Sequence, residues 1–250
     1  MNKLLIGSVA LAAMIAGPAM AADMPLKAPP PPVPVFSWTG CYWGGQIGYG
    51  WARARATATA GVFNGADKTA QYNVSGELGG GEIGCNYQVG NWVWGVEVDG
   101  SWAAKDGQNN LIAPFVVTFV DKISERWLAT ARGRLGYAWD KWMWYITGGA
   151  AWGGFDVTEY NSFSAATLAS QVAIERHSKV GWVVGFGTEY ALAYGWSAKW
   201  ETLYMDFGHV HSFDAVACCT PQDTRFTQWV SRFGLNYRFN WGKYPVVAKY

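Results

Sequence analysis

This 250-residue chain has little charge, few histidines and cysteines, and almost no long apolar runs. Charged residues make up 15% of it, and 19 Lys and Arg nearly balance 18 Asp and Glu, so the formal net charge is +1. Such a balance gives no electrostatic basis for binding nucleic acid. After the N-terminal segment, glycine or a charged residue interrupts every apolar stretch that could form a transmembrane helix, which excludes spanning helices.

Aromatic residues and glycine are abundant instead, with 16 Trp, 13 Tyr and 31 Gly. The aromatic content excludes a disordered chain, and the lack of a strict glycine period excludes a collagen-like one. The aromatic residues also follow a strand period. In WVWGVEVDGSW, residues 92–102, one face carries Trp and Val and the other carries Val93, Gly95, Glu97, Asp99 and Ser101. An apolar face bracketed by Trp, opposite a charged face, is typical of a barrel strand with lipid outside and a polar lumen inside.

The same alternation recurs in eight segments. These are residues 40–52, 78–89, 92–102, 126–138, 142–153, 180–192, 196–207 and 226–239. The connections alternate between short (90–91, 140–141, 193–195) and long (53–77, 103–125, 154–179, 208–225). The sequence therefore predicts an all-β fold, an eight-stranded antiparallel transmembrane β-barrel with short periplasmic turns, long surface loops and both termini in the periplasm.

Four parts of the chain are predicted. Residues 1–21 match a cleavable signal peptide, with an early lysine, an apolar stretch and a small-residue cleavage site ending at Ala21. Residues 22–37 contain the run APPPPVP, which favours an extended periplasmic spacer. A contact between this spacer and the cell wall is an alternative without specific support. Residues 38–239 form the barrel, and residues 240–250 form a C-terminal tail.

The predicted lumen is charged. An eight-stranded barrel is just wide enough for side chains to fill it. Strand parity places five acidic and five basic residues inside: Glu82, Glu97, Asp99, Glu189 and Glu201, with Arg132, Arg134, Lys199, Arg232 and Arg238. Charges this deeply buried require partners. Their balance favours an internal ion-pair network that blocks the lumen, and a narrow gated conductance is the alternative.

Several segments resemble a known family. They include SWTGCYWGGQIGYGW (37–51), GGGEIGCNYQVGNWVWGVE (79–97), ATARGRLGYAWDKWMWYITGGAAWG (129–153) and GLNYRFNWGKYPVVAKY (234–250). Together they are similar to the outer-membrane immunogenic proteins of alphaproteobacteria, which are small eight-stranded barrels. The resemblance covers nearly all of the chain after the signal peptide and is weakest in the long loops. It implies a location in the cell outer membrane, among lipid and lipopolysaccharide. It also implies that the barrel-insertion machinery recognises an aromatic-ended last strand, here ending at Phe239.

The resemblance constrains activity only loosely, because members of the family are described as surface antigens, structural proteins, small porins or haem binders. We predict a structural barrel with antigenic surface loops. The alternatives are a small narrow porin and a surface receptor for haem or another, unknown ligand.

Three histidines limit the chemistry available. His177 lies in a long connection between acidic and polar neighbours, but nothing in the sequence fixes a Ser–His–carboxylate triad, so an enzyme is not expected. His209 and His211 follow the seventh segment, with Asp206 nearby, and could make a weak contact with haem or a metal. Solvated side chains are the favoured interpretation, and no cofactor or metal site is predicted.

The four cysteines form two separate pairs. Cys41 and Cys85 lie at the periplasmic rim of neighbouring antiparallel segments, both with outward parity. Cross-strand partners approach the distance that a disulfide needs, so this pair is either bridged or a pair of free thiols. Cys218 and Cys219 lie in the last long connection, too far away to reach the first pair. They are expected to form a vicinal ring, to link to a partner or to remain reduced.

Overall fold

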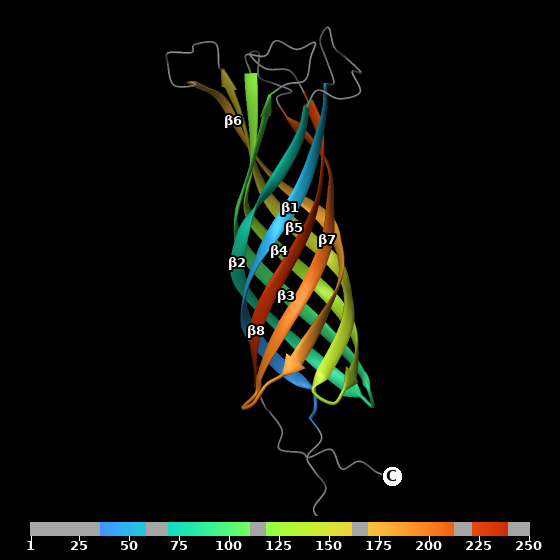
Figure 1. Cartoon of the computed structure of the whole chain (residues 1–250). Helices are drawn as coiled ribbons and strands as arrows, with labels where there is room; N and C mark the ends of the chain where they lie inside the picture. The colour runs from blue at the N-terminus through green and yellow to red at the C-terminus, as the bar shows by residue number, and fades with distance from the viewer. Residues whose placement is uncertain (1–35, 59–69, 111–118, 162–169, 213–221, 240–250) are drawn as a thin grey trace, which may run out of the picture. The chain divides into compact units, whose positions relative to one another are not determined.

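The computed structural model describes residues 36–58, 70–110, 119–161, 170–212 and 222–239. Within them the chain forms eight strands: β1 (Gly40–Ala58), β2 (Ala70–Val89), β3 (Trp92–Asn110), β4 (Phe119–Trp139), β5 (Trp142–Asn161), β6 (Ser170–Ala191), β7 (Trp196–Ser212) and β8 (Gln222–Arg238). Each strand pairs antiparallel with its neighbours, and β1 pairs with β8, which closes the barrel (Figure 1). The predicted fold class is confirmed. No helix among the described residues is long and apolar enough to cross a membrane.

The two ends of the barrel differ in their connections. At one end, which we call the turn end, β2 and β3 are joined by Gly90 and Asn91, and β4 and β5 by Asp140 and Lys141. The first residue of each turn has a positive φ, 59° for Gly90 and 54° for Asp140. Glycine adopts this conformation freely, and aspartate adopts it more readily than most residues. The predicted strand boundaries at this end agree with the structure to within one residue. We call the opposite end the loop end.

At the loop end the prediction was wrong, because the strands are longer than expected. They contain 17–22 residues, whereas about 9–11 residues cross a membrane. Much of each predicted long loop is therefore strand. The physical reason is a reversal of polarity. Beyond Trp51 the exposed residues of β1 are Arg53 and Arg55, whereas Ala52 and Ala54 are buried. The apolar outward face that identifies a lipid-facing strand therefore ends at Trp51, where this reversal begins.

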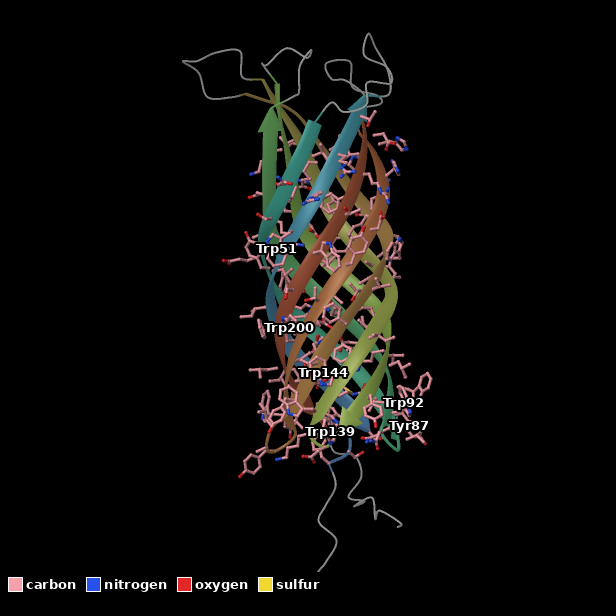
Figure 2. All side chains as sticks on the ribbon, turned by 45° about the vertical axis from the view of Figure 1, so that its right-hand side comes forward. Trp51, Tyr87, Trp92, Trp139, Trp144 and Trp200 are labelled. Carbon is pink, nitrogen blue, oxygen red and sulfur yellow. A yellow bond between two sulfur atoms is a disulfide. The ribbon has the colours of Figure 1, made fainter. Side chains whose placement is uncertain are left out.

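Two rows of aromatic side chains lie on the outward surface. The row near the turn end consists of Trp43, Tyr87, Trp92, Tyr137, Trp142, Tyr190, Trp196 and Tyr237. The row toward the loop end consists of Trp51, Trp102, Trp127, Trp152, Trp182, Tyr204 and Trp229. Figure 2 shows Tyr87, Trp92 and Trp139 near the turn end and Trp51 well above them. Neighbouring rings pack together, as in Trp142 and Tyr190, whose centroids are 4.7 Å apart. Rows of this kind mark the two membrane–water interfaces.

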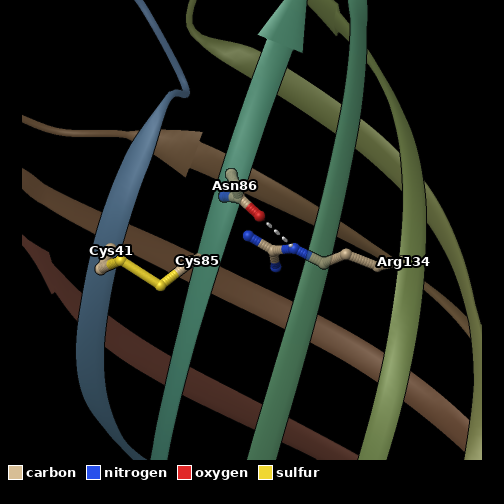
Figure 3. Close-up of a disulfide and its surroundings, with 4 residues drawn as sticks. All are labelled: Cys41, Cys85, Asn86 and Arg134. Carbon is tan, nitrogen blue, oxygen red and sulfur yellow. Dashed lines mark hydrogen bonds between the residues drawn. A yellow bond between two sulfur atoms is a disulfide. The ribbon is translucent and has the colours of Figure 1, made fainter.

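Cys41 and Cys85 are joined by a disulfide on the outward face of β1 and β2 (Figure 3). The two residues are directly opposite in the strand register, with Cα atoms 3.9 Å apart. Cys218 and Cys219 lie outside the described residues.

Candidate functional site: the filled lumen

Side chains fill the lumen in three layers. From the turn end these are a stopper layer around Trp38, a charged layer, and an outer apolar layer. Nine of the ten predicted lumen charges make up the charged layer: Glu82, Glu97, Asp99, Arg132, Arg134, Glu189, Lys199, Glu201 and Arg232. They come from β2, β3, β4, β6, β7 and β8, so the network ties distant strands together across the barrel.

Glu97 lies at the centre of the charged layer. Its carboxylate forms an ion pair with Arg132, its direct cross-strand partner, and lies 3.1 Å from Lys199 Nζ and 3.4 Å from Arg134 Nη1. The hydroxyl of Tyr42 also donates a hydrogen bond to it, at 2.5 Å. A buried carboxylate is stable only when its lone pairs are satisfied in this way.

Asp99 and Glu201 bind the other arginines. Arg232 donates from Nη1 and Nη2 to the two oxygens of Asp99, at 2.8 and 2.9 Å. This bidentate arrangement is the strong form of an arginine–carboxylate pair. Arg232 also pairs with Glu201, its cross-strand partner. Glu201 in addition accepts hydrogen bonds from Arg132 at 3.1 Å and from the Tyr145 hydroxyl at 3.0 Å.

The remaining acids complete the network. Glu82 accepts a hydrogen bond of 2.5 Å from Lys199. Glu189 accepts one from Arg134 at 3.2 Å and one from the Ser197 hydroxyl at 2.5 Å. Uncharged residues such as Tyr42, Tyr145 and Ser197 were not among the predicted site residues. Their inward parity in the strand pattern was the signal that could have placed them in the lumen.

Inward glycines make room for these large side chains. A Cβ atom on Gly95 would lie 2.9 Å from Cγ of Arg134, whose Nε donates to Asn86 Oδ1 at 2.8 Å (Figure 3). A Cβ atom on Gly187 would lie 2.6 Å from the Tyr145 hydroxyl. The glycines thus let arginine and tyrosine side chains cross a narrow lumen.

The tenth predicted charge, Arg238, contributes to the stopper layer instead. Its Nη1 donates to the backbone oxygen of Ser37 at 2.9 Å, and its guanidinium lies 4.7 Å from the ring centroid of Trp38 and 5.0 Å from that of Phe36. Sequence parity places Arg238 correctly inside but assigns it the wrong neighbours.

Trp38 closes the turn end of the lumen. Its side chain is completely buried among inward residues of β3, β4, β5 and β6: Val93, Ala138, Met143, Tyr145 and Ala191. Its backbone N–H donates to Oε1 of Gln88 at 2.7 Å. Phe36 packs against the same cluster. We call Phe36, Ser37 and Trp38 the N-terminal stopper. The two described residues of the range predicted to be spacer, Phe36 and Ser37, therefore contact the barrel.

The outer apolar layer lies beyond the charged layer, toward the loop end. Three phenylalanines form its centre: Phe226 lies 4.4 Å from Phe155 and 6.1 Å from Phe207 between ring centroids. A fully buried pair lies within the layer, since Lys105 Nζ is 2.8 Å from Glu125 and 2.7 Å from Oε1 of Gln228. The sequence prediction missed this pair because it placed both charged residues in a loop.

The histidines lie in strands and not in loops. His177 is on β6, with Nε2 3.2 Å from Glu175. His209 and His211 are exposed on β7, and their Nδ1 atoms lie 2.8 and 3.7 Å from Asp223. Asp206, the expected neighbour of these two histidines, is bound by Arg225 at 2.8 Å.

One cluster of carboxylates in the charged layer has the spacing of a possible metal site. Oxygen atoms of Glu82, Glu97 and Glu201 lie within 4.8 Å of one another. Lys199 Nζ lies 2.5, 3.1 and 3.6 Å from them, so the lysine ammonium already provides the positive charge at their centre. The cluster therefore does not fit a metal ion.

Comparison with known proteins identifies the family. A model of the outer membrane protein beta-barrel domain matches residues 9–239. The chain belongs to this family. It is 33% identical to the 31 kDa outer-membrane immunogenic protein of Brucella melitensis biotype 1, over 96% of this chain and 100% of that protein. It is 31% identical to the 25 kDa outer-membrane immunogenic protein of Brucella abortus biovar 1, over 96% and 99% of the two chains.

A solved structure supports the same architecture. The outer membrane protein OprG from Pseudomonas aeruginosa superposes with a TM-score of 0.50, covering 80% of this chain and 96% of that chain at 14% sequence identity. The chain is thus an outer membrane barrel protein located in the outer membrane. In barrels of this kind the end with short turns faces the periplasm, which puts the loop end toward the cell surface.

Proposed function

We propose that this protein is a sealed structural barrel of the outer membrane, without enzymatic activity, whose surface connections are antigenic. The observation that carries the proposal is the charged layer. Five acids and four bases from six strands pair with one another there, and the side chains of Arg132, Glu201 and Arg232 are at most 1% exposed. A conducting path needs weakly held, hydrated groups, whereas these side chains hold one another in a fixed network.

One further observation supports the sealed barrel, and another supports the antigenic surface. The apolar layers above and below the charged layer bury Phe226 and Trp38, and apolar constrictions of this kind oppose the entry of water and ions. The antigenic surface is supported by the names of the two Brucella relatives, both described as immunogenic.

Single-channel recording in a planar lipid bilayer tests the proposal. The refolded protein is expected to give no current steps above the leak of the bare bilayer, whereas a large porin inserted under the same conditions serves as the positive control. Discrete steps carried by the wild-type protein would overturn the sealed barrel and support the narrow porin. A heat-modifiable band on a detergent gel shows that the recorded sample is folded.

The haem alternative is tested separately. His209 and His211 both direct Nδ1 toward Asp223 on the outward surface. Titration with hemin is expected to give the same spectrum for the wild type and for a His209→Ala, His211→Ala variant. A saturable Soret shift in the wild type that is lost in the variant would contradict the purely structural role and support haem binding.

A further inference from the structure

We propose that an arginine cluster on the outward surface of β1 and β8 binds the phosphate groups of an outer-leaflet glycolipid. The cluster consists of Arg53, Arg55 and Arg225. This inference rests on the outer-membrane location and is independent of whether the lumen conducts ions.

The position of the cluster matches the lipid headgroup layer. Trp51 and Trp229 are direct cross-strand partners in the outer aromatic row. Arg53 follows Trp51 by two residues on the same face, about 7 Å along the strand, and at a tilt of about 40° this places it about 5 Å higher. The headgroup region extends about 5–8 Å beyond the hydrocarbon on each side. The guanidinium groups of the cluster therefore lie at the depth of the lipid phosphates.

The two arginines of the cluster that lie on β1 have no acidic residue on their own strand. Arg55 and Arg225 are directly opposite each other in the β1–β8 register, and like charges in this position repel. Strand β1 contains no acidic residue, and the partners of Arg53 on its two sides are Asn73 and Thr227. An anion between the two strands would relieve the repulsion.

Arg225 is held in place by β7, the strand that pairs with β8 on the side away from β1. Its Nη2 donates to Oδ2 of Asp206 at 2.8 Å, and Oδ1 of Asp206 accepts the backbone N–H of Gly208 at 2.8 Å. Gly208, with a φ of 67°, lies within an irregularity of the strand register between Asp206 and His209. More than half of the Arg225 side chain is still exposed, so donors remain available.

The chemistry of the cluster favours phosphate over other headgroups. A guanidinium presents several donors in a planar fork that matches phosphate geometry. Arginine is the only cation in the cluster. A zwitterionic phospholipid would bring its own positive charge into the site, whereas the phosphates of an acylated glucosamine disaccharide carry net negative charge. Acyl chains of the same lipid would lie along the apolar face below Trp51.

The test uses native mass spectrometry of the refolded protein in zwitterionic detergent, with diphosphoryl lipid A as the probe. The Arg53→Gln, Arg55→Gln variant removes two charges from the cluster. The Arg126→Gln, Arg176→Gln variant removes two charges from β4 and β6, where both arginines face Asp156 instead of each other. A heat-modifiable gel shift establishes that each variant is folded.

We expect the wild type to retain one lipid A molecule and the β1 variant to bind it about twenty-five-fold more weakly, since each of the two lost contacts near an anionic surface is worth about five-fold. The control variant should change by less than about two-fold. An Arg53→Lys, Arg55→Lys variant should be intermediate because it keeps the charge but loses the fork.

Three results would overturn the proposal: no retained lipid A in the wild type, equal losses in the two Gln variants, or equal binding of lipid A stripped of its phosphates. Retention of inorganic phosphate by the wild type without any retention of lipid A would instead assign the cluster to a free anion and exclude the glycolipid.

Discussion

Glu97 and Arg132 are direct cross-strand partners whose ion pair is enclosed by the barrel, with only 2% and 1% of their side chains exposed. The pair forms within one hairpin, β3 and β4, but each residue also binds groups from β7. The local pairing thus becomes part of a network that spans the lumen.

Removing one member of this network should destabilise the barrel strongly. In a Glu97→Gln variant, Arg132, Arg134 and Lys199 lose a shared counter-ion, so we expect a loss of about 3–5 kcal/mol in the free energy of unfolding. Urea unfolding in lipid vesicles, followed by tryptophan fluorescence, measures it. Glu77→Gln on the exposed face of β2 is the matched control and should stay within about 0.5 kcal/mol of the wild type. A Glu97→Gln loss as small as that of the control would contradict the network.

The N-terminal stopper should contribute stability although it lies outside the strands. Trp38→Ala removes a completely buried side chain, so a loss of about 3–5 kcal/mol is expected. Trp139→Ala, at a position that is 79% exposed, serves as the control. Added indole should restore part of the loss only in the Trp38→Ala variant, because only that variant contains a cavity of the right shape. Equal effects of the two substitutions would mean that Trp38 does not occupy the lumen.

The disulfide can be tested directly. Mass spectrometry of non-reduced digests should show Cys41 joined to Cys85. The bond closes a loop of 44 residues, so a Cys41→Ser, Cys85→Ser variant should lose up to about 4 kcal/mol in the chain-entropy account. Discovery of Cys41 joined to Cys218 or Cys219 would contradict the β1–β2 register.

The assembly signal in the last strand is expected to end at Phe239. Its backbone N–H donates to the carbonyl of Cys41 at 2.9 Å, and its ring packs 5.7 Å from that of Tyr237. Truncation after Phe239 should preserve the amount of heat-modifiable barrel in the outer membrane, whereas Phe239→Asp should reduce it severely. The opposite pattern would transfer the assembly signal to the tail that ends at Tyr250.

The sequence was most informative where lipid and lumen impose opposite polarities on alternate residues. Parity alone placed Glu97, Arg132 and Glu201 inside. It could not predict Trp38, because that residue precedes the first strand and has no parity to read. It also missed Lys105, which keeps the inward parity of Glu97 and Asp99, because the outward face of β3 is no longer apolar beyond Trp102. It missed Glu125 because a register irregularity between Glu125 and Trp127 shifts the period of β4. Which acid binds which base depends on the curvature of the closed sheet and on glycine positions.

The reversal of polarity along the strands also sets the bilayer thickness that the barrel can tolerate. Between Trp43 and Trp51 the outward face of β1 advances eight residues, about 26 Å along the strand. At a tilt of about 40° this corresponds to a height of about 20 Å. The bacterial outer membrane has a thinner than average hydrocarbon layer. In a thicker bilayer, acyl chains would have to cover the arginines beyond Trp51 or the bilayer would have to thin around the barrel, so the protein should favour regions of short-chain lipid.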